Sequence, residues 1–379
     1  MNSTLLKLTK RVVLITCGTL FCLGHAIAAP LIGAYVWGGM LDGGHGVDRF
    51  QRSVGFLLDH GFEAVRFTVT PPSIKQYGID DLCSNDRRDG CYLRAMLDGK
   101  VFDDSRLKLV MVTLHDFASQ PDHMLDPDFI AAHRDAIRAE TSDALEVLAK
   151  RFAGRNVQVI VSNWEGDNMI YCGQVYAFAR DRKAADQCLA KIGGEAGLVH
   201  RLEGFASWIA LRESAINDIQ RKYANLAIEQ APEFVVFNLT GSPQWQCTTL
   251  CKAGLTVLAK FTQGQKLPMC SYSAYDSLKA GTLDADLDRI GQICSKVVLG
   301  EVGFRQRDGD NSNPASDYAK LERAVADHAG TLTAMIYWNA FESADSTDKG
   351  FGLYRGDGSP RNVRALPSAL APKGSKPSS

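Results

Sequence analysis

Two glutamates stand where apolar segments end, and their type and placement suggest chemistry. Residues 157–168 read VQVIVSNWEGDN, so a β-branched run stops shortly before Glu165. Residues 296–303 read KVVLGEVG and bring Glu301 between two glycines. Such runs are typical of strands buried on both faces, and a charged side chain at the end of one cannot lie unpaired in an apolar layer. The two glutamates therefore predict a site that uses a pair of carboxyl groups.

A pair of carboxyl groups about 5 Å apart can hydrolyse a glycosidic bond with retention of configuration. One group protonates the departing oxygen, and the other attacks the anomeric carbon. We predict Glu165 as the acid/base, with Trp164 excluding water beside it, and Glu301 as the nucleophile, kept ionised by Arg66 or a tyrosine hydroxyl. Asp167 is a competing candidate for the acid.

The elements that must position these residues alternate along the chain. Apolar runs and amphipathic segments follow one another from residue 31 onward, the pattern of repeated βα units. This predicts an α/β protein with a (β/α)8 TIM barrel, decorated βα loops and an active site at the carboxyl ends of the strands. A doubly wound open sheet is the alternative, but no GxGxxG turn follows the first strand. The eight expected strands are Leu31–Trp37, Glu63–Thr68, Leu107–His115, Val157–Ser162, Glu233–Leu239, Met269–Tyr275, Lys296–Glu301 and Thr331–Trp338. Long helices are expected over Asp126–Phe152 and from about Leu198 to Ala231, where Pro232 ends the second one.

Both ends of the chain differ from the predicted barrel. Basic residues, an apolar run and Ala26-Ile27-Ala28 predict a secretory signal peptide over residues 1–28, followed by one catalytic domain over 29–365. Residues 366–379 are rich in Pro, Ser and Lys and are expected to be a disordered tail. An exported protein of this kind is secreted or periplasmic, and no membrane contact is expected after signal cleavage.

Composition limits the partners. The chain of 379 residues is 45% hydrophobic and 22% charged, ordinary values for a globular protein. Removing residues 1–28 takes away three positive charges and no negative ones, which changes the net charge from −1 to −4. A mildly acidic surface argues against nucleic acid as a partner. We expect a monomer that binds a carbohydrate.

Eight cysteines remain after the signal peptide, and an even number in an exported chain indicates disulfides. Connectivity does not follow from sequence, but the cysteines fall into neighbouring pairs along the chain. No CxxC occurs, and no histidine pair stands at ligand spacing beside them, so the metal interpretation is weak. The expected pairs are Cys83–Cys91, Cys172–Cys188, Cys247–Cys251 and Cys270–Cys294.

The layout resembles the large clan of retaining glycoside hydrolases with a (β/α)8 barrel, which includes the cellulase and mannanase families. In that clan the acid/base ends strand four and the nucleophile ends strand seven, and Gly300-Glu301-Val302-Gly303 is similar to the nucleophile motif. The resemblance implies no metal and no organic cofactor. It also implies substrate contacts from an arginine on strand two, a tyrosine on strand six and a sugar-stacking tryptophan on strand eight. The expected substrate-binding residues are Trp37, Arg66, His115, Asn163, Trp164, Trp245, Tyr272, Tyr275 and Trp338.

One departure from the clan concerns strand four. The clan commonly places Asn directly before the acid Glu, whereas Trp164 stands between Asn163 and Glu165 here. Either a bulge at the strand end restores the geometry, or Asn163 does not contact the sugar as usual. The departure favours an alternative of a different class, a carbohydrate-binding barrel without catalysis. A metal-dependent barrel hydrolase is a further rival, but its clustered ligands are not found in the sequence.

Overall fold

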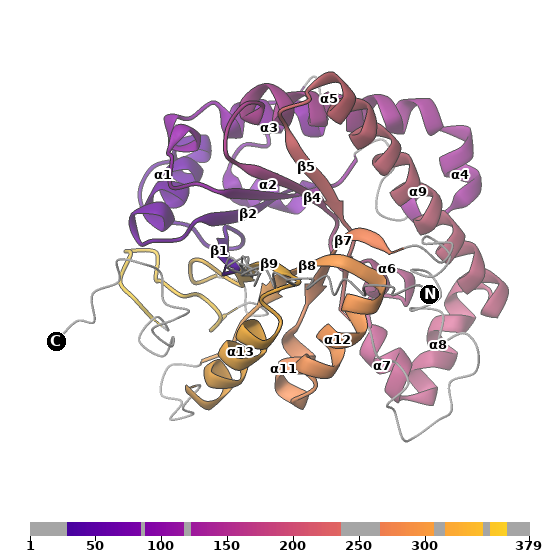
Figure 1. Ribbon diagram of the computed structural model, residues 1–379. Coiled ribbons are helices and arrows are strands. Elements are labelled where there is room, and N and C mark those ends of the chain that lie inside the picture. Colours follow the sequence, from indigo (N-terminus) through magenta and orange to yellow (C-terminus); the bar gives the residue numbers. More distant parts are fainter. Residues whose placement is uncertain are drawn as a thin grey trace, which may run out of the picture.

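Parallel strands form the centre of the molecule and helices surround them in the computed structural model (Figure 1). The structure describes residues 29–84, 88–116, 123–235, 266–306, 315–343 and 349–361. Every pairing between neighbouring strands is parallel, in the order β5-β4-β3-β2-β1-β9-β8-β7-β6. The strands of the described chain are β1 (Leu31–Tyr35), β2 (Ala64–Val69), β3 (Leu109–Leu114), β4 (Gln158–Ser162), β5 (Ala227–Ala231), β6 (Glu233–Phe234), β7 (Leu267–Ser273), β8 (Cys294–Val302) and β9 (Leu332–Tyr337).

The sheet closes on itself at Pro232. β5 and β6 are consecutive pieces of one strand, separated by this proline, which has no N–H to donate to a ladder. β5 pairs with β4, and β6 pairs with β7. The carbonyl of Pro232 accepts a hydrogen bond of 2.9 Å from the amide of Ser271 in β7. Eight strand positions therefore form a closed ring, which confirms the (β/α)8 barrel and excludes the open sheet.

The fifth strand was predicted too late in the sequence. We expected a helix up to Ala231 and a strand over Glu233–Leu239, but α9 ends at Lys222 and β5 begins at Ala227. The segment AIEQA has good helix-forming composition, and its place between two buried strands overrides that local preference. The predicted helix over residues 126–152 is also divided, into α4 and α5 with His133 between them.

The helices lie outside the ring of strands (Figure 1). The longest is α9, which packs against α5 and against β5. The described helices of at least five residues are α1 (Gly46–Asp59), α2 (Pro71–Tyr77), α3 (Asp89–Leu97), α4 (Pro127–Ala132), α5 (Arg134–Phe152), α6 (Gly166–Ile170), α7 (Val175–Arg180), α8 (Arg182–Ile192), α9 (Gly194–Lys222), α11 (Tyr275–Ala280), α12 (Leu283–Ile293) and α13 (Ala315–Asp327).

Two apolar cores follow from the alternation of side chains along the strands. The larger lies between the strands and the helices. The smaller fills the barrel itself, where Met111, Ile160, Met269 and Val298 are among its members. Toward the carboxyl ends of the strands, beyond this smaller core, the barrel interior contains polar side chains such as Arg66 and Glu301. This is the end of the barrel where the site is expected.

Three of the four predicted disulfides are confirmed: Cys83–Cys91, Cys172–Cys188 and Cys270–Cys294. The pair Cys247–Cys251, the signal segment 1–28 and the tail 366–379 lie outside the described residues. No helix in the described part of the chain combines the length and the apolar character needed to cross a membrane.

Candidate active site

Glu301 lies at the carboxyl end of β8 and faces into the mouth of the barrel, with 3% of its surface exposed. The glycines on either side of it are required by space. A methyl group at Gly300 would collide with Ser271, Glu233 and Arg66, and one at Gly303 would collide with the carbonyl of Trp338. The motif around Glu301 is therefore shaped by polar side chains that fill the barrel below it.

Glu165 reaches the same mouth from the loop after β4. β4 pairs with β3 and β5 in regular register up to Ser162, so the inserted tryptophan is accommodated after the strand ends. The backbone turns at Glu165 itself, with φ 24° and ψ 69°, a region that residues other than glycine rarely adopt. This turn leaves Trp164 47% exposed while Glu165 is only 8% exposed. The local strain is of the kind found at functional sites.

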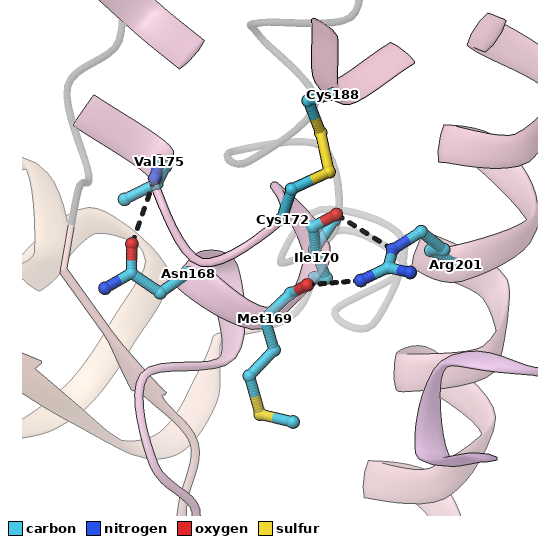
Figure 2. The surroundings of a disulfide bond; sticks show 7 residues. All are labelled: Asn168, Met169, Ile170, Cys172, Val175, Cys188 and Arg201. Atoms are coloured by element: carbon cyan, nitrogen blue, oxygen red, sulfur yellow. Dashed lines mark hydrogen bonds between the residues drawn. A yellow bond between two sulfur atoms is a disulfide. The ribbon is translucent and has the colours of Figure 1, made fainter. Parts of the chain in front are cut away.

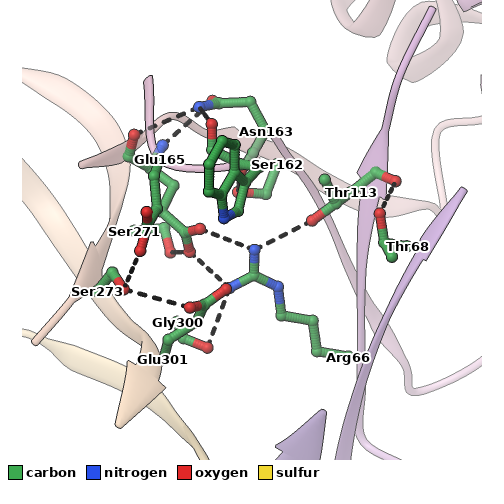
Figure 3. Close-up of polar contacts among 12 residues, drawn as sticks. Arg66, Thr68, Thr113, Ser162, Asn163, Glu165, Ser271, Ser273, Gly300 and Glu301 are labelled. Atoms are coloured by element: carbon green, nitrogen blue, oxygen red, sulfur yellow. Dashed lines mark hydrogen bonds and ion pairs between the residues drawn. The ribbon is translucent and has the colours of Figure 1, made fainter. Parts of the chain in front are cut away.

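One hydroxyl joins the two glutamates. Ser273 Oγ, at the end of β7, lies 3.0 Å from Glu165 Oε1 and 3.3 Å from Glu301 Oε2 (Figure 3). The two carboxylate oxygens are therefore no farther apart than the sum of these two lengths. This close approach favours a retaining mechanism, in which the carboxyl groups lie about 5 Å apart, over an inverting one, in which they stand farther apart to admit a water molecule. The geometry allows the two carboxyl groups to act on the two atoms of one bond.

Arg66 supplies positive charge beneath Glu301. Its guanidinium donates to Glu233 at 2.5 and 2.8 Å, to Thr113 Oγ1 at 3.1 Å and to the carbonyl of Gly300 at 3.1 Å. Nη1 also lies 3.3 Å from Glu301 Oε1. Figure 3 shows Arg66 extending from β2 toward Glu301. The sequence predicted Arg66 as a site residue but not Glu233. Glu233 was expected at the beginning of the fifth strand, whereas it lies near the carboxyl end of that strand, at the barrel mouth.

The electrostatics of the site follow from three buried carboxyl groups, of which Glu233 and Glu301 lie beside Arg66. Burial raises the pKa of Glu165 to about 7, repulsion from Glu233 adds to the shift, and the bond from Asn168 opposes it. Burial also raises the pKa of Glu301 well above its ordinary value, with Glu233 adding and Arg66 opposing. The pKa of Tyr275 is raised by burial and then by Glu301, so its hydroxyl keeps the proton that it donates to Glu301 Oε2 at 3.3 Å.

Asn163 and Asp167 hold the chain in place around the mouth. Asn163 accepts from the amide of Glu233 at 3.1 Å and donates to its carbonyl at 3.3 Å, so its side chain ties β4 to β6. Both carboxylate oxygens of Asp167 accept from the amide of Val235, at 2.9 and 3.1 Å. These bonds favour Glu165 over Asp167 as the acid, and they show that Asn163 is engaged by the backbone.

Of the two tyrosines predicted for strand six, only Tyr275 lies at the site. Ser271 and Ser273 point into the barrel, and because side chains alternate along a strand, Tyr272 points outward. Its hydroxyl bonds Asp286 of α12 at 2.8 Å. The prediction of Tyr272 as a substrate contact is therefore corrected, since the serines occupy the inward positions.

A cleft of about 660 Å³ opens beside the carboxyl groups. Glu165 and Glu301 do not line it, but Thr113, which bonds Arg66, connects it to them. Trp37 and Trp338 lie 6.2 Å apart between ring centroids and form an aromatic surface. The predicted residues that line the cleft are Trp37, His115, Asn163, Trp164 and Trp338, joined by Tyr35, Trp208, Met124 and Met169. The predicted Trp245 lies outside the described residues.

His115 has the character of a neutral wall residue. It is 6% exposed, and burial lowers its pKa to about 4. Its backbone amide donates to Asp89 Oδ2 at 3.1 Å, which holds the end of β3 against α3. The side chain therefore adds no charge to the cleft at neutral pH.

One group of described residues has donor atoms close enough for a cation. Asp126, Asp128 and His200 have ligand atoms within 4.8 Å of one another. Asp126 caps α4 through bonds from the amides of Asp128 and Phe129, and it pairs with His200 at 3.4 Å. Helix capping and this ion pair account for the arrangement.

Comparison with known proteins gives the fold a context. No family model and no curated protein matches the chain. Solved structures do match. A family 1 β-glucosidase from Thermotoga maritima aligns with TM-score 0.55 and 10% identity over 86% of this chain and 92% of that enzyme. A β-glucuronidase 2 mutant from Bacteroides uniformis aligns with TM-score 0.51 and 12% identity.

The second alignment covers 88% of this chain but only 33% of the β-glucuronidase, so this chain spans about a third of that protein. At such identities the likeness establishes the fold alone. The barrel is thus of the kind found in these glycoside hydrolases, and the chemistry must be argued from the residues at its mouth.

Proposed function

We propose that this protein is an exported glycoside hydrolase that cleaves O-glycosidic bonds of a poly- or oligosaccharide with retention. Glu165 acts as the acid/base and Glu301 as the nucleophile. The observation that carries the proposal is the hydroxyl of Ser273, which lies within hydrogen-bond distance of both carboxyl groups at the barrel mouth. Active sites of this fold lie at the carboxyl ends of the strands.

The division of roles rests on the donors around each carboxyl group. Glu301 receives the charge of Arg66 at 3.3 Å and the hydroxyl of Tyr275, which stabilise its ionised form. Glu165 is bonded by the neutral side chains of Asn168 and Ser273, and burial raises its pKa to about 7. Burial raises the pKa of both carboxyl groups, so the assignment rests on the cation: Arg66 lies beside Glu301, and we therefore place the proton of the pair on Glu165.

In the first step the carboxylate of Glu301 forms a bond to the anomeric carbon. The glycosidic bond breaks, its electron pair stays on the departing oxygen, and that oxygen takes the proton of Glu165. In the second step Glu165 removes a proton from water, whose oxygen bonds the anomeric carbon and releases Glu301. Two inversions give net retention, and the protein ends in its starting state.

The cleft supports a carbohydrate substrate. Aromatic faces such as those of Trp37 and Trp338 pack against the apolar faces of sugar rings, and polar lining residues such as Thr70 and His115 can hydrogen-bond sugar hydroxyls. The disulfides fit an oxidising compartment, which is consistent with a secreted or periplasmic protein. We propose that it acts as a monomer and needs no metal or organic cofactor for the two steps above.

The alternative, a carbohydrate-binding barrel without catalysis, drew its support from the tryptophan inserted before Glu165. That insertion displaces Trp164 to the surface and leaves Glu165 beside Glu301. Two carboxyl groups this close together are what a retaining mechanism requires, and this counts against the alternative.

The proposal is tested with purified mature protein on aryl glycosides whose leaving groups range from activated to poor. We expect Glu301→Gln to abolish hydrolysis of all of them. Glu165→Gln should lose most of its activity on substrates with poor leaving groups, because the first step lacks its acid. On substrates with activated leaving groups the second step lacks its base, and added azide should restore turnover of Glu165→Gln there. Glu195→Gln, on the exposed side of α9, is the matched control and should behave as wild type. NMR of the first-formed sugar should show the anomeric configuration of the substrate.

Three results would contradict the proposal. Inverted configuration would exclude the covalent intermediate. Full activity of either glutamine variant would exclude that residue from its role. Binding of glycans by wild type and both variants, without hydrolysis by any of them, would favour the non-catalytic barrel.

A further inference from the structure

Asn168 lies directly against the proposed acid/base and is held in one orientation. Its Oδ1 accepts from the backbone amide of Val175 at 3.0 Å (Figure 2). A backbone N–H can only donate, so the oxygen of the Asn168 amide must face Val175 and the nitrogen must face the other way. That nitrogen, Nδ2, lies 2.6 Å from Glu165 Oε2.

This orientation decides which oxygen of Glu165 is an acceptor. An amide NH₂ group donates and never accepts, so Oε2 receives the bond from Asn168 in both protonation states of Glu165. A proton on Oε2 directed toward Asn168 would face another donor. The oxygen left for the proton is Oε1, which lies 3.0 Å from Ser273 Oγ.

The hydroxyl of Ser273 extends this direction to the second carboxyl group. It has one proton and two lone pairs, so it accepts from Glu165 Oε1–H while it donates to Glu301 Oε2 at 3.3 Å. Each of the three hydrogen bonds that link Asn168, Glu165, Ser273 and Glu301 then joins one donor to one acceptor. It places the proton of Glu165 on the side that faces Glu301.

The segment that carries Asn168 is fastened at several points. The disulfide Cys172–Cys188 joins the loop after α6 to α8, and Arg201 of α9 donates to the carbonyls of Ile170 at 2.9 Å and Met169 at 2.5 Å (Figure 2). Cys172 has φ 60°, a conformation that costs energy in a residue other than glycine and persists where the surroundings hold it. The segment is therefore built to keep its shape.

We propose that Asn168, held in the segment closed by the Cys172–Cys188 disulfide, is a positioning residue that fixes the proton of Glu165 on Oε1, facing Ser273 and Glu301. The assignment of Glu165 as acid/base rests on the proposed function, whereas the position of the proton is a property of the carboxyl group itself. The ionisable groups that act on Glu165 or are acted on by it are Glu233 of β6, Asp167 of α6, Glu301 of β8 and Tyr275 of α11.

Two substitutions separate positioning from simple structure. Asn168→Ala removes both bonds of the side chain. Asn168→Asp keeps an oxygen for the amide of Val175 but replaces the donor to Glu165 with a second acceptor that carries like charge. Loss of the donor destabilises the ionised form of Glu165, so its titration midpoint should rise by about one pH unit in Asn168→Ala and further in Asn168→Asp.

The direct measurement is an NMR titration of the carboxyl carbon of Glu165 in protein labelled at glutamate, with the signal assigned by its loss in Glu165→Gln. It needs no substrate, so it tests Asn168 even if the wild type hydrolyses no glycoside and the proposed function fails. A midpoint that is unchanged or lower in both Asn168 variants overturns the proposal.

Kinetics add a second readout. We expect kcat/KM of Asn168→Ala to fall about 10- to 100-fold on poor leaving groups and little on activated ones, with the alkaline limb of the pH profile displaced upward. If Asn168 had a merely structural role, its substitution would lower kcat/KM equally on both classes of substrate and leave the alkaline limb in place. That result would contradict the proposal.

The disulfide provides a matched pair of variants. Cys172→Ser/Cys188→Ser should displace the alkaline limb in the same direction as Asn168→Ala. Cys83→Ser/Cys91→Ser opens a disulfide at α3 that does not adjoin Asn168, and it should leave the limb where it is. Equal displacement in both pairs would show that the effect is general loosening.

Discussion

Arg66 and Glu233 form a bidentate ion pair in the interior of the barrel, with hydrogen bonds of 2.5 and 2.8 Å and both side chains fully buried. Ser271 adds a bond of 2.7 Å to Glu233. Glu301 lies directly beyond this pair, 3.3 Å from the same guanidinium. Arg66 therefore stabilises the charge of the proposed nucleophile, and Glu233 balances the buried charge of Arg66.

Breaking this pair should be costly. Glu233→Gln leaves Arg66 buried without its main counter-charge, and we expect the free energy of unfolding to fall by about 3 kcal/mol. Chemical denaturation measures the loss. Lys296→Gln is the control, because it opens the more exposed pair with Glu229 and should cost less than about 1 kcal/mol. Equal losses would mean that the buried pair contributes no more than a surface pair.

The same variant should change the pH dependence of activity. Repulsion from Glu233 raises the pKa of both Glu165 and Glu301, so removing its charge should lower both pKa values. We expect the alkaline limb of kcat/KM to move toward lower pH in Glu233→Gln, opposite to its movement in Asn168→Ala. A limb that stays in place would show that Glu233 does not act on the titrating group.

Glu165 should destabilise the fold at neutral and alkaline pH. Its pKa is about 7 in the folded chain against an ordinary 4.5, so the folded and unfolded chains both bind the proton below pH 4.5 and no cost arises there. Between pH 4.5 and 7 the unfolded chain ionises more readily, and stability falls. Glu165→Gln should therefore be more stable than wild type by about 1 to 3 kcal/mol at pH 8 and nearly equal at pH 4.

Denaturation at these two pH values measures the difference, with Glu195→Gln expected to lie within about 0.5 kcal/mol of wild type at both. The glutamine can accept from Asn168 and donate to Ser273, so it reproduces the protonated acid. An equal gain at pH 4 and pH 8 would disprove the linkage to ionisation.

Ser273→Ala should impair catalysis more than stability. It removes the hydroxyl between Glu165 and Glu301, and the loss of one preorganised donor lowers kcat by about 100-fold or more. Ser277→Ala is matched to it, since Ser277 is also buried but bonds the carbonyl of Ala274 at the start of α11 and the side chain of Tyr272, which points away from the site. Steady-state kinetics of the two variants should diverge, and similar losses would show that the bridge has no special part in the reaction.

Gly300→Ala should disrupt the interior of the barrel. The added methyl group would overlap Ser271 and Glu233 and crowd Arg66, so we expect a loss of about 1 to 3 kcal/mol together with reduced activity. Gly291→Ala tests the opposite case, because its methyl group meets nothing and α12 gains helix propensity of about 0.5 to 1 kcal/mol. If Gly300→Ala were as stable as wild type, the space around Arg66 and Glu233 would have to be large enough for a methyl group, which would contradict the structure.

Local patterns were sufficient for much of the architecture. β4, which ends just before Glu165, and β8, which carries Glu301, contain continuous apolar runs, and such runs are typical of strands buried on both faces. Cysteines separated by 8 to 24 residues paired with their neighbours. Prediction failed for the fifth strand. The segment AIEQA has the composition of a helix but forms β5, so the strand was predicted to begin only at Glu233, and Glu233 was not recognised as a residue at the end of a strand.

The sequence by itself determined the barrel, most of its strands, and the placement of Glu165 and Glu301 at or just after the ends of two of them, because these depend on the hydrophobicity of short segments. Only the tertiary structure decided that Ser273 faces inward and Tyr272 outward, that Glu233 meets Arg66 and that Asn168 meets Glu165. These contacts depend on the phase of each strand relative to the closed barrel and on the turn at Glu165. Neither quantity is encoded in any one segment, because each is set by how all the strands and loops pack together.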